Sequence, residues 1–133
     1  MVIVDSDALI GLISDDDKLH ERCLQIQRYL IQNNLQLVIP YPIVLEAASA
    51  LARVMNRPDL TAKLLNDYEE SDDQMDYKVA TLVANLYNPK TSKKNTPFDH
   101  YVLALAKKNN IQYIFSFDSF YKKNGLTSIE ELL

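Results

Sequence analysis

Four acidic residues of this sequence stand alone inside apolar stretches: Asp5, Glu46, Asp99 and Asp118. Such a placement is unusual, because Asp and Glu are almost never buried without a partner. Glu46 is the only charged residue between positions 37 and 52, and Asp118 directly follows the run YIFSF. Gathering several carboxylates costs free energy through desolvation and like-charge repulsion unless protons or cations compensate. We therefore expect these side chains to share a strong bound positive charge.

A divalent metal ion is the natural candidate for that charge. The chain has one Cys and two His, and an oxygen-only ligand set suits Mg²⁺ or Mn²⁺, with water and phosphate oxygens in the remaining positions. This chemistry points to a phosphodiester substrate. A metal lowers the pKa of a bound water to give the nucleophile, and its charge stabilises the transition state and the leaving oxygen. One or two ions would serve.

The order of expected elements brings these acids to one place. Strands are expected at 1–4, 37–39, 113–117 and 127–129, and helices at 8–14, 18–32, 43–55, 58–68, 77–87 and 97–108, with an acidic solvated connector at 69–73. This alternation predicts an α/β fold with a parallel sheet. Residues just beyond the carboxyl ends of such strands line the ligand crevice, which is where Asp5 and Asp118 fall. Glu46 and Asp99 would enter from the helices that follow.

Each acid also has a purely structural interpretation. Asp99 lies three residues after Thr96, the spacing of a capping box, and Asp5 suits a turn or a helix N-cap. Glu46 could occupy the exposed face of an amphipathic helix, and Asp118 could be a turn residue. That four such residues fall in segments converging on one crevice favours a common site.

Composition limits the remaining possibilities. The 133 residues, 47% hydrophobic and 24% charged, predict a single globular domain over 1–133. The net charge of −4 argues against a binder that relies on bulk positive charge. Cys23 is the only cysteine, which excludes an intramolecular disulfide or a Cys-based zinc site. We find no apolar run long enough for a membrane span, and Asp5 and Asp7 interrupt the N-terminal apolar stretch, so we expect a cytoplasmic protein without a membrane partner.

Four strings together resemble PIN-domain ribonucleases, especially the small VapC-type toxins: VDSDALI (4–10), PIVLEAASAL (42–51), FDHYVLALAKKNN (98–110) and IFSFDSFY (114–121). The resemblance spans nearly the whole chain. It implies a three-layer α/β/α fold around a central, mainly parallel sheet of about five strands. It also implies an acidic Mg²⁺ or Mn²⁺ pocket that cleaves RNA to 5′-phosphate and 3′-hydroxyl ends. The relatives implied by this resemblance commonly form homodimers and are held by a cognate antitoxin protein that packs over the active site.

The resemblance also implies roles for individual residues. The catalytic and metal-binding acids would be Asp5, Glu46, Asp99 and Asp118. Ser6 and Ser116 match accessory hydroxyl positions beside the first and the last acid, where a hydroxyl can bond a carboxylate or a metal-bound water, or cap a helix or turn. Relatives often have Thr after the first Asp and before the last, whereas this chain has Ser6 in the first place and Ser116-Phe117-Asp118 in the second.

Other polar residues are weaker candidates. Asp7 could contact a metal or water, or act only as an acid in the first turn of a helix. His100 is adjacent to Asp99, but neighbours on a helix point in different directions. The lysines of the 89–97 loop (Lys90, Lys93 and Lys94), with Arg53 and Arg57, could contact an RNA backbone or form a solvated surface.

Three alternative functions stay open at this point. Asp5-Ser6-Asp7 also resembles the catalytic pair of haloacid-dehalogenase-type phosphatases, but that family expects Thr at Leu9 and further motifs for which the 15 residues after Asp118 (133 − 118 = 15) leave no room. A receiver-like signalling domain would need a Lys near the end of the last strand. A catalytically silent PIN-fold module that binds RNA or protein is the non-enzyme alternative.

Overall fold

The structure is a computed structural model of the chain, and it describes residues 1–68, 75–91 and 93–133. The acidic connector expected at 69–73 therefore lies outside the described residues. The strands are β1 (Val2–Val4), β2 (Leu37–Val38), β3 (Tyr113–Phe115) and β4 (Thr127–Ser128). The helices are α1 (Ser6–Ile13), α2 (His20–Gln32), α3 (Tyr41–Arg53), α4 (Pro58–Asp67), α5 (Ala80–Leu86), α6 (Pro97–Lys108), α7 (Ser119–Lys123) and the 3-10 helix η1 (Ile129–Leu132).

The four strands form one parallel sheet in the order β2-β1-β3-β4. Val2 of the central strand β1 pairs with Leu37 on one side and with Tyr113 on the other. Parallel neighbours need crossover connections, which place helices on both faces of a sheet. The predicted α/β fold with a central parallel sheet is confirmed; the described residues supply four strands, compared with about five expected.

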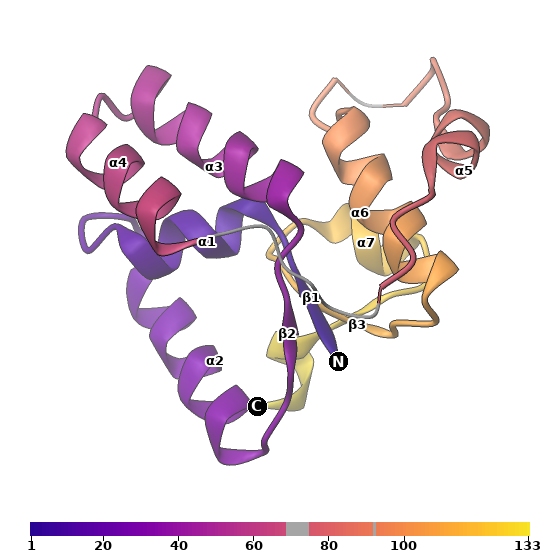
Figure 1. Cartoon of the computed structure of the whole chain (residues 1–133). Helices are drawn as coiled ribbons and strands as arrows, with labels where there is room; N and C mark the ends of the chain where they lie inside the picture. The colour runs from indigo at the N-terminus through magenta and orange to yellow at the C-terminus, as the bar shows by residue number, and fades with distance from the viewer. Residues whose placement is uncertain (69–74, 92) are drawn as a thin grey trace.

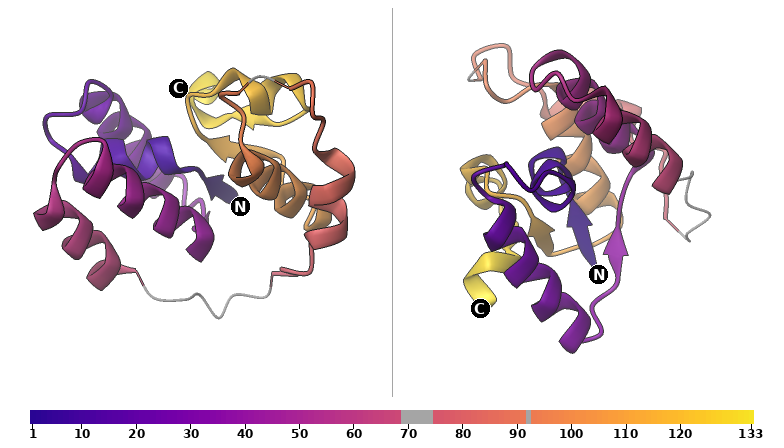
Figure 2. Two further views of the ribbon diagram at one scale, coloured as in Figure 1. Left: turned by 90° about the horizontal axis from the view of Figure 1, so that it is seen from above. Right: turned by 90° about the vertical axis from the view of Figure 1, so that its left-hand side faces the viewer.

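Helices flank the sheet on two sides and complete the three layers. Helices α1 to α4 lie to the left of β1 in Figure 1 and α5 to α7 lie to its right, and the view from above in Figure 2 shows β1 between the same two groups. Because it is covered from both sides, β1 is apolar throughout, and Val2, Ile3 and Val4 are fully buried. Asp5 directly follows the strand and is the first polar residue at its carboxyl end.

Helices α1 and α2 approach each other closely at one glycine. A Cβ atom added at Gly11 would lie 2.4 Å from Cys23 Sγ, well inside van der Waals contact. Cys23 is fully buried, and the apolar stripe expected for this helix, Cys23 with Ile26 and Leu30, faces the core. His20 Nδ1 also lies 2.7 Å from the Gly11 carbonyl oxygen. Gly11 thus lets α2 pack against the helix that carries the first residues of the crevice.

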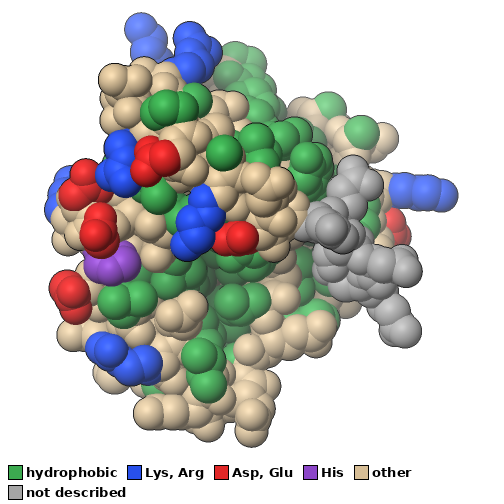
Figure 3. All heavy atoms as spheres, turned by 60° about the vertical axis from the view of Figure 1, so that its left-hand side comes forward, with side chains coloured by type: hydrophobic (Ala, Val, Ile, Leu, Met, Phe, Trp, Pro, Cys, Tyr) green, Lys and Arg blue, Asp and Glu red, His purple; other side chains and the backbone are tan. Residues whose placement is uncertain are grey.

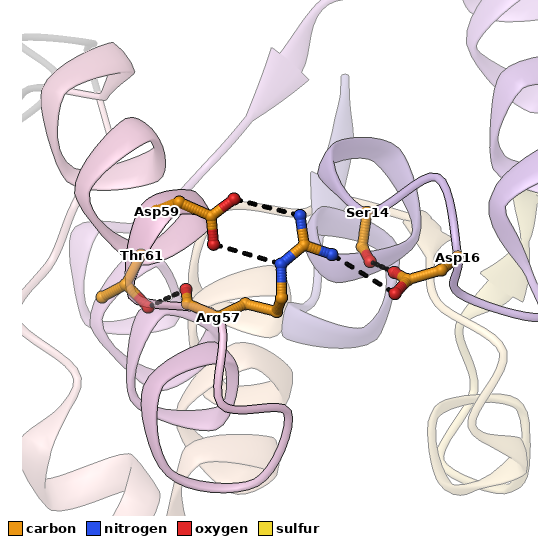
Figure 4. A network of polar contacts seen from close by, with 5 residues as sticks. All are labelled: Ser14, Asp16, Arg57, Asp59 and Thr61. Atoms are coloured by element: carbon orange, nitrogen blue, oxygen red, sulfur yellow. Dashed lines mark hydrogen bonds and ion pairs between the residues drawn. The ribbon is translucent and has the colours of Figure 1, made fainter.

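Hydrogen bonds from the Arg57 side chain join the loop after α1 to the start of α4 (Figure 4). Arg57 donates to Asp59 at 3.0 and 3.1 Å and to Asp16 at 3.2 Å, while Ser14 donates to Asp16. Thr61 closes the network by donating to the Arg57 carbonyl oxygen at 2.9 Å. Arg57 is therefore engaged by acidic partners here and lies outside the set of residues that line the acidic pocket described below.

Several element boundaries differ from the sequence-based expectations. The helix expected at 77–87 is α5, which begins at Ala80. The side chains of α5 are at most half-buried because this helix packs on the outside of α6, and the buried residue of the segment is Val79, just before the helix. The strand expected at 113–117 ends at Phe115, since the Phe117 amide donates to the Asp7 carboxylate at 2.8 Å instead of to a neighbouring strand. The short helices α7 and η1 were not expected.

No helix in the described parts of the chain is long and apolar enough to cross a membrane. On the side of the molecule that holds α2 and α4, the side chains shown in colour mix acidic, basic and hydrophobic types (Figure 3). This mixture is unlike the continuous basic stripe that follows a nucleic-acid backbone in many binding proteins.

Candidate active site

A pocket of about 430 Å³ opens at the carboxyl ends of β1 and β3. Its lining comes from four separate segments: residues 5–7 at the start of α1, helix α3, residues 94–99 at the start of α6, and the loop after β3. The residues that line it are Asp5, Ser6, Asp7, Glu46, Ala50, Lys94, Thr96, Asp99, Phe117 and Asp118. All four acids singled out in the sequence are therefore gathered in one pocket, together with a fifth, Asp7.

Asp5 is the most buried of these carboxylates, with 3% of its surface exposed. It follows β1 directly and is the N-cap residue of α1, with its backbone carbonyl accepting from the Leu9 amide at 3.2 Å. Its Oδ2 accepts from the Ser116 hydroxyl at 3.2 Å, whereas its buried Oδ1 has no hydrogen-bond partner among the described residues. Burial, reinforced by the charge of Asp7, raises the pKa of Asp5 to about 8. Without a cation, this carboxyl is thus held in its protonated form near neutral pH.

Glu46 faces the pocket from α3. Its carboxylate accepts a hydrogen bond from the Ser6 hydroxyl in the first turn of α1, which joins two helices that are far apart in the sequence. Partial burial raises the pKa of Glu46, with Asp99 adding a smaller contribution of the same sign. These contacts favour the site interpretation of Glu46 over the exposed-helix interpretation.

Asp99 both caps helix α6 and lines the acidic pocket. Its Oδ2 accepts from the Thr96 amide at 2.7 Å, the bond expected of a capping box at the start of α6. Its Oδ1 lies 3.4 Å from the hydroxyl of Tyr121, which donates to it. Burial raises the pKa of Asp99, and the nearby charge of Asp118 acts in the same direction.

Asp118 likewise combines a turn role with a place in the pocket. Its Oδ1 accepts from the Phe120 amide at 2.9 Å and so caps α7, as the turn interpretation predicts. Its Oδ2 accepts from the Asn95 side-chain amide at 3.1 Å. The second bond ties Asp118 to the basic loop that precedes α6.

Asp7 and Ser116 brace the ends of the two central strands against each other. Asp7 Oδ2 accepts from the Phe117 amide at 2.8 Å and lies 3.2 Å from the Ser116 hydroxyl, which is equally close to Asp5. The Asp118 amide in turn donates to Ser116 Oγ at 3.1 Å. Burial raises the pKa of Asp7. Asp7 therefore fixes the pocket wall, a role that its position in the first helical turn did not reveal.

The structure distinguishes the three loop lysines and places behind the pocket one aromatic residue that the sequence analysis did not single out. Lys94 lines the pocket, whereas Lys90 and Lys93 of the same loop are outside its lining. Tyr121 is fully buried behind the acids, and burial together with Asp5 raises the pKa of its hydroxyl, which stays a hydrogen-bond donor. One signal was available: its string IFSFDSFY places an aromatic residue three positions after the last acid.

The donor set suits a hard cation. All five acidic side chains offer oxygen, and Asp5 Oδ1 is a buried acceptor without a partner in the described chain. Among the described residues, no group of three or more His, Cys, Asp or Glu side chains is arranged to hold one metal ion. Oxygen ligands are the type that Mg²⁺ and Mn²⁺ prefer.

Comparisons with known proteins agree with this architecture. The model of the PIN domain family matches residues 2–125. Among solved structures, the Mycobacterium tuberculosis toxin VapC20, described as cleaving the sarcin-ricin loop, superimposes with a TM-score of 0.74 over 96% of this chain and 97% of its own, at 14% sequence identity. No curated protein matches the sequence. The likeness to VapC20 shows a shared fold. The family match covers nearly the whole chain, and it favours the PIN resemblance over the phosphatase and receiver alternatives. The chain therefore belongs to the PIN domain family, whose members are nucleases.

Proposed function

We propose that this chain is a divalent-metal-dependent endoribonuclease that hydrolyses RNA phosphodiester bonds in the acidic pocket, and that residues 1–133 act as one PIN domain. The observation that carries the proposal is Asp5 Oδ1, a buried acceptor without a partner in the described residues, in a pocket with four other carboxylates. Leaving a buried acceptor open costs about 1–3 kcal/mol. A bound cation would offset that cost and the like-charge repulsion together.

Mg²⁺ or Mn²⁺ would be held by the four acids of the sequence prediction: Asp5, Glu46, Asp99 and Asp118. When bound, such an ion supplies positive charge that activates water and stabilises the phosphodiester transition state. The chain itself prepares the oxygens: the Ser6 hydroxyl orients Glu46, and the Ser116 hydroxyl orients Asp5. Ser6 and Ser116 are thus positioning residues.

Lys94 gives the pocket its one basic lining residue within the described chain. An ammonium group at the rim of an acidic pocket attracts the phosphate of an incoming RNA, which the carboxylates alone would repel. We therefore propose that Lys94 binds the substrate backbone.

The toxin of a toxin–antitoxin pair is the biological role that we propose. The support is the fold shared with VapC20, which is itself described as a toxin. This role implies a cognate antitoxin protein as a partner, a homodimer as the assembly and the cytoplasm as the location. Growth arrest on expression would test the toxin role and co-purification with the product of a neighbouring gene the antitoxin partner. Light scattering of the purified protein would test the homodimer, and cell fractionation the location.

Cleavage of mixed structured RNAs by the purified protein in Mn²⁺, Mg²⁺ or EDTA tests the activity. We expect cutting in either metal, none in EDTA and none by the Asp5→Asn protein, which also exposes any contaminating nuclease. Glu21→Gln is the matched control, because it removes a carboxylate from an exposed position of α2. A protein that binds RNA but cuts it under no condition would instead be the silent PIN-fold module.

A further inference from the structure

A second pocket, also of about 430 Å³, lies next to the acidic one. Asn95 lines this second pocket, and its side-chain amide donates at 3.1 Å to Asp118, which lines the acidic pocket. His100 lines the second pocket, and its neighbour in sequence, Asp99, lines the first. At Asn95 and Asp118 the two pockets are therefore separated by side chains in direct contact.

His100 presents an open acceptor to this second pocket. The side chain is 3% exposed, and its Nδ1 lies 2.8 Å from the Thr96 carbonyl oxygen, which can only accept. Nδ1 thus carries the proton, which leaves Nε2 as an acceptor in the neutral ring. No described residue hydrogen-bonds Nε2. The rings of Tyr87 and Phe120, each centred 5.0 Å from the imidazole, hold it in place.

The second pocket also holds side-chain carbonyl oxygens that can accept from a ligand, beside the amide of Asn88 and the hydroxyls of Thr91 and Ser119, which can donate. The side-chain amide nitrogens of Asn95 and Asn124 already donate, to Asp118 and to the Phe120 carbonyl oxygen respectively, so their carbonyl oxygens remain for a ligand. None of the described residues that line this pocket is acidic, and Lys123 is its charged member. A complementary ligand therefore brings N–H donors together with a negative charge.

We propose that the second pocket binds the nucleotide adjacent to the cleaved phosphodiester, with a base that carries an exocyclic amino group. Cytosine, adenine and guanine offer such a group to His100, Asn95 and Asn124, whereas uracil does not. Lys123 would bind the phosphate of that nucleotide. The cavity has the size of ordinary ligand sites, and RNA is read through unstacked single-stranded bases. The position beside the cut rests on the proposed function; the binding of the nucleotide does not.

Binding is tested without cleavage by titrating the full chain in EDTA with CMP or UMP and following it by NMR. We expect CMP to shift the side-chain amides of Asn95 and Asn124 and the imidazole nitrogens of His100, and to bind about fivefold more tightly than UMP, the effect of one ordinary hydrogen bond. The variants Asn124→Ala and Lys123→Gln, both at exposed positions, should each weaken CMP. Lys18→Gln, an exposed lysine between α1 and α2, is the matched control.

A cleavage assay provides the second test of the proposal, with short RNAs that differ only in the bases flanking one cut site. The wild-type protein should favour an amino-bearing base on one side of the cut, and Asn124→Ala should reduce that preference to within about twofold. Nucleotides that leave the second pocket unshifted would overturn the proposal, including the case in which a protein segment fills it. Selective CMP binding without RNA cleavage under any condition would instead overturn the proposed nuclease function and leave the nucleotide site standing.

Discussion

Asp5 is a carboxylate that the fold buries while leaving one of its oxygens without a partner in the described chain. Three neighbours in the pocket, Asp7, Glu46 and Asp99, also have raised pKa values, and burial is the main cause for each. Burying several carboxyls side by side costs stability unless a positive charge compensates. Their gathering in one pocket is the residue-level feature that favours catalysis.

Asp5→Asn should abolish metal-dependent RNA cleavage and raise the melting temperature in metal-free buffer by several degrees. At a pH above about 8, where Asp5 is ionised, the amide keeps the size of the side chain and removes a buried charge that repels Asp7. Thermal unfolding in EDTA, beside an activity assay in Mn²⁺, measures both effects. Glu21→Gln should leave both values near wild type, and full activity of the Asp5→Asn protein would remove this residue from the mechanism.

Two substitutions at Asp99 should separate its capping role from its catalytic role. Asp99→Asn keeps an acceptor for the Thr96 amide, so the fold should survive while cleavage is lost. Asp99→Ala removes the acceptor as well and should cost about 1 kcal/mol in the free energy of unfolding. Urea titration distinguishes the two variants; equal stabilities would show that the cap contributes nothing.

The sequence predicted the acids of the pocket because each is isolated among apolar residues. Asp5, Glu46, Asp99 and Asp118 all line the pocket, while their catalytic roles remain predictions. The residues that support them were less visible. Asn95 sits in a polar loop where an amide is ordinary, and its bond to Asp118 depends on a contact across 23 positions that no local pattern encodes.

At the scale of elements, the contact of α1 with α2 depends on the absence of a side chain at Gly11. Gly11→Ala should lower the free energy of unfolding by about 1–3 kcal/mol, because the new Cβ would overlap Cys23 Sγ in a filled core. Urea unfolding of the purified variant measures this loss.

A double-mutant cycle isolates the cause. Cys23→Ala removes the sulfur, so adding Gly11→Ala to it should be neutral or stabilising by up to about 1 kcal/mol, the helix propensity of Ala over Gly. If Gly11→Ala destabilises both backgrounds equally, the close approach to Cys23 is not what requires a glycine.

Most elements were predictable because hydrophobic periodicity and caps mark them. Each predicted helix and strand has a counterpart in the described structure, with shifts of one to three residues at most ends. The exceptions are elements whose ends are set by side-chain hydrogen bonds and not by the hydrophobic pattern of the sequence. α7 spans only Ser119–Lys123, too short for a periodic signal, and it begins because Asp118 caps it. Likewise β3 ends early because the Phe117 amide donates to Asp7.

At the scale of the whole molecule, metal-free stability should fall as the pH rises from about 4 to about 8. The pKa of Asp5 is 3.8 in its ordinary state and about 8 in the folded protein. Across that window the folded state therefore holds a proton that the unfolded chain has released, and the free energy of unfolding decreases with pH. Urea midpoints in EDTA at several pH values measure the slope.

Metal should reverse that trend, because Mn²⁺ binds the deprotonated carboxylates of the folded state and its stabilisation grows with pH. The Asp5→Asn protein should show a flatter profile in EDTA. A wild-type profile that is flat, or that rises toward pH 8 without metal, would contradict the raised pKa of Asp5.

The close approach of α1 and α2 also makes the alkylation rate of Cys23 a measure of how often these two helices separate. Burial raises the pKa of the Cys23 thiol to about 12, so the reactive thiolate is scarce while the two helices are in contact. Alkylation of this single thiol must therefore wait for α2 to move away from α1, the helix that carries Ser6 and Asp7. Its labelling rate reports local opening of the pocket wall, and a slower rate in Mn²⁺ than in EDTA would show that filling the pocket holds that wall closed.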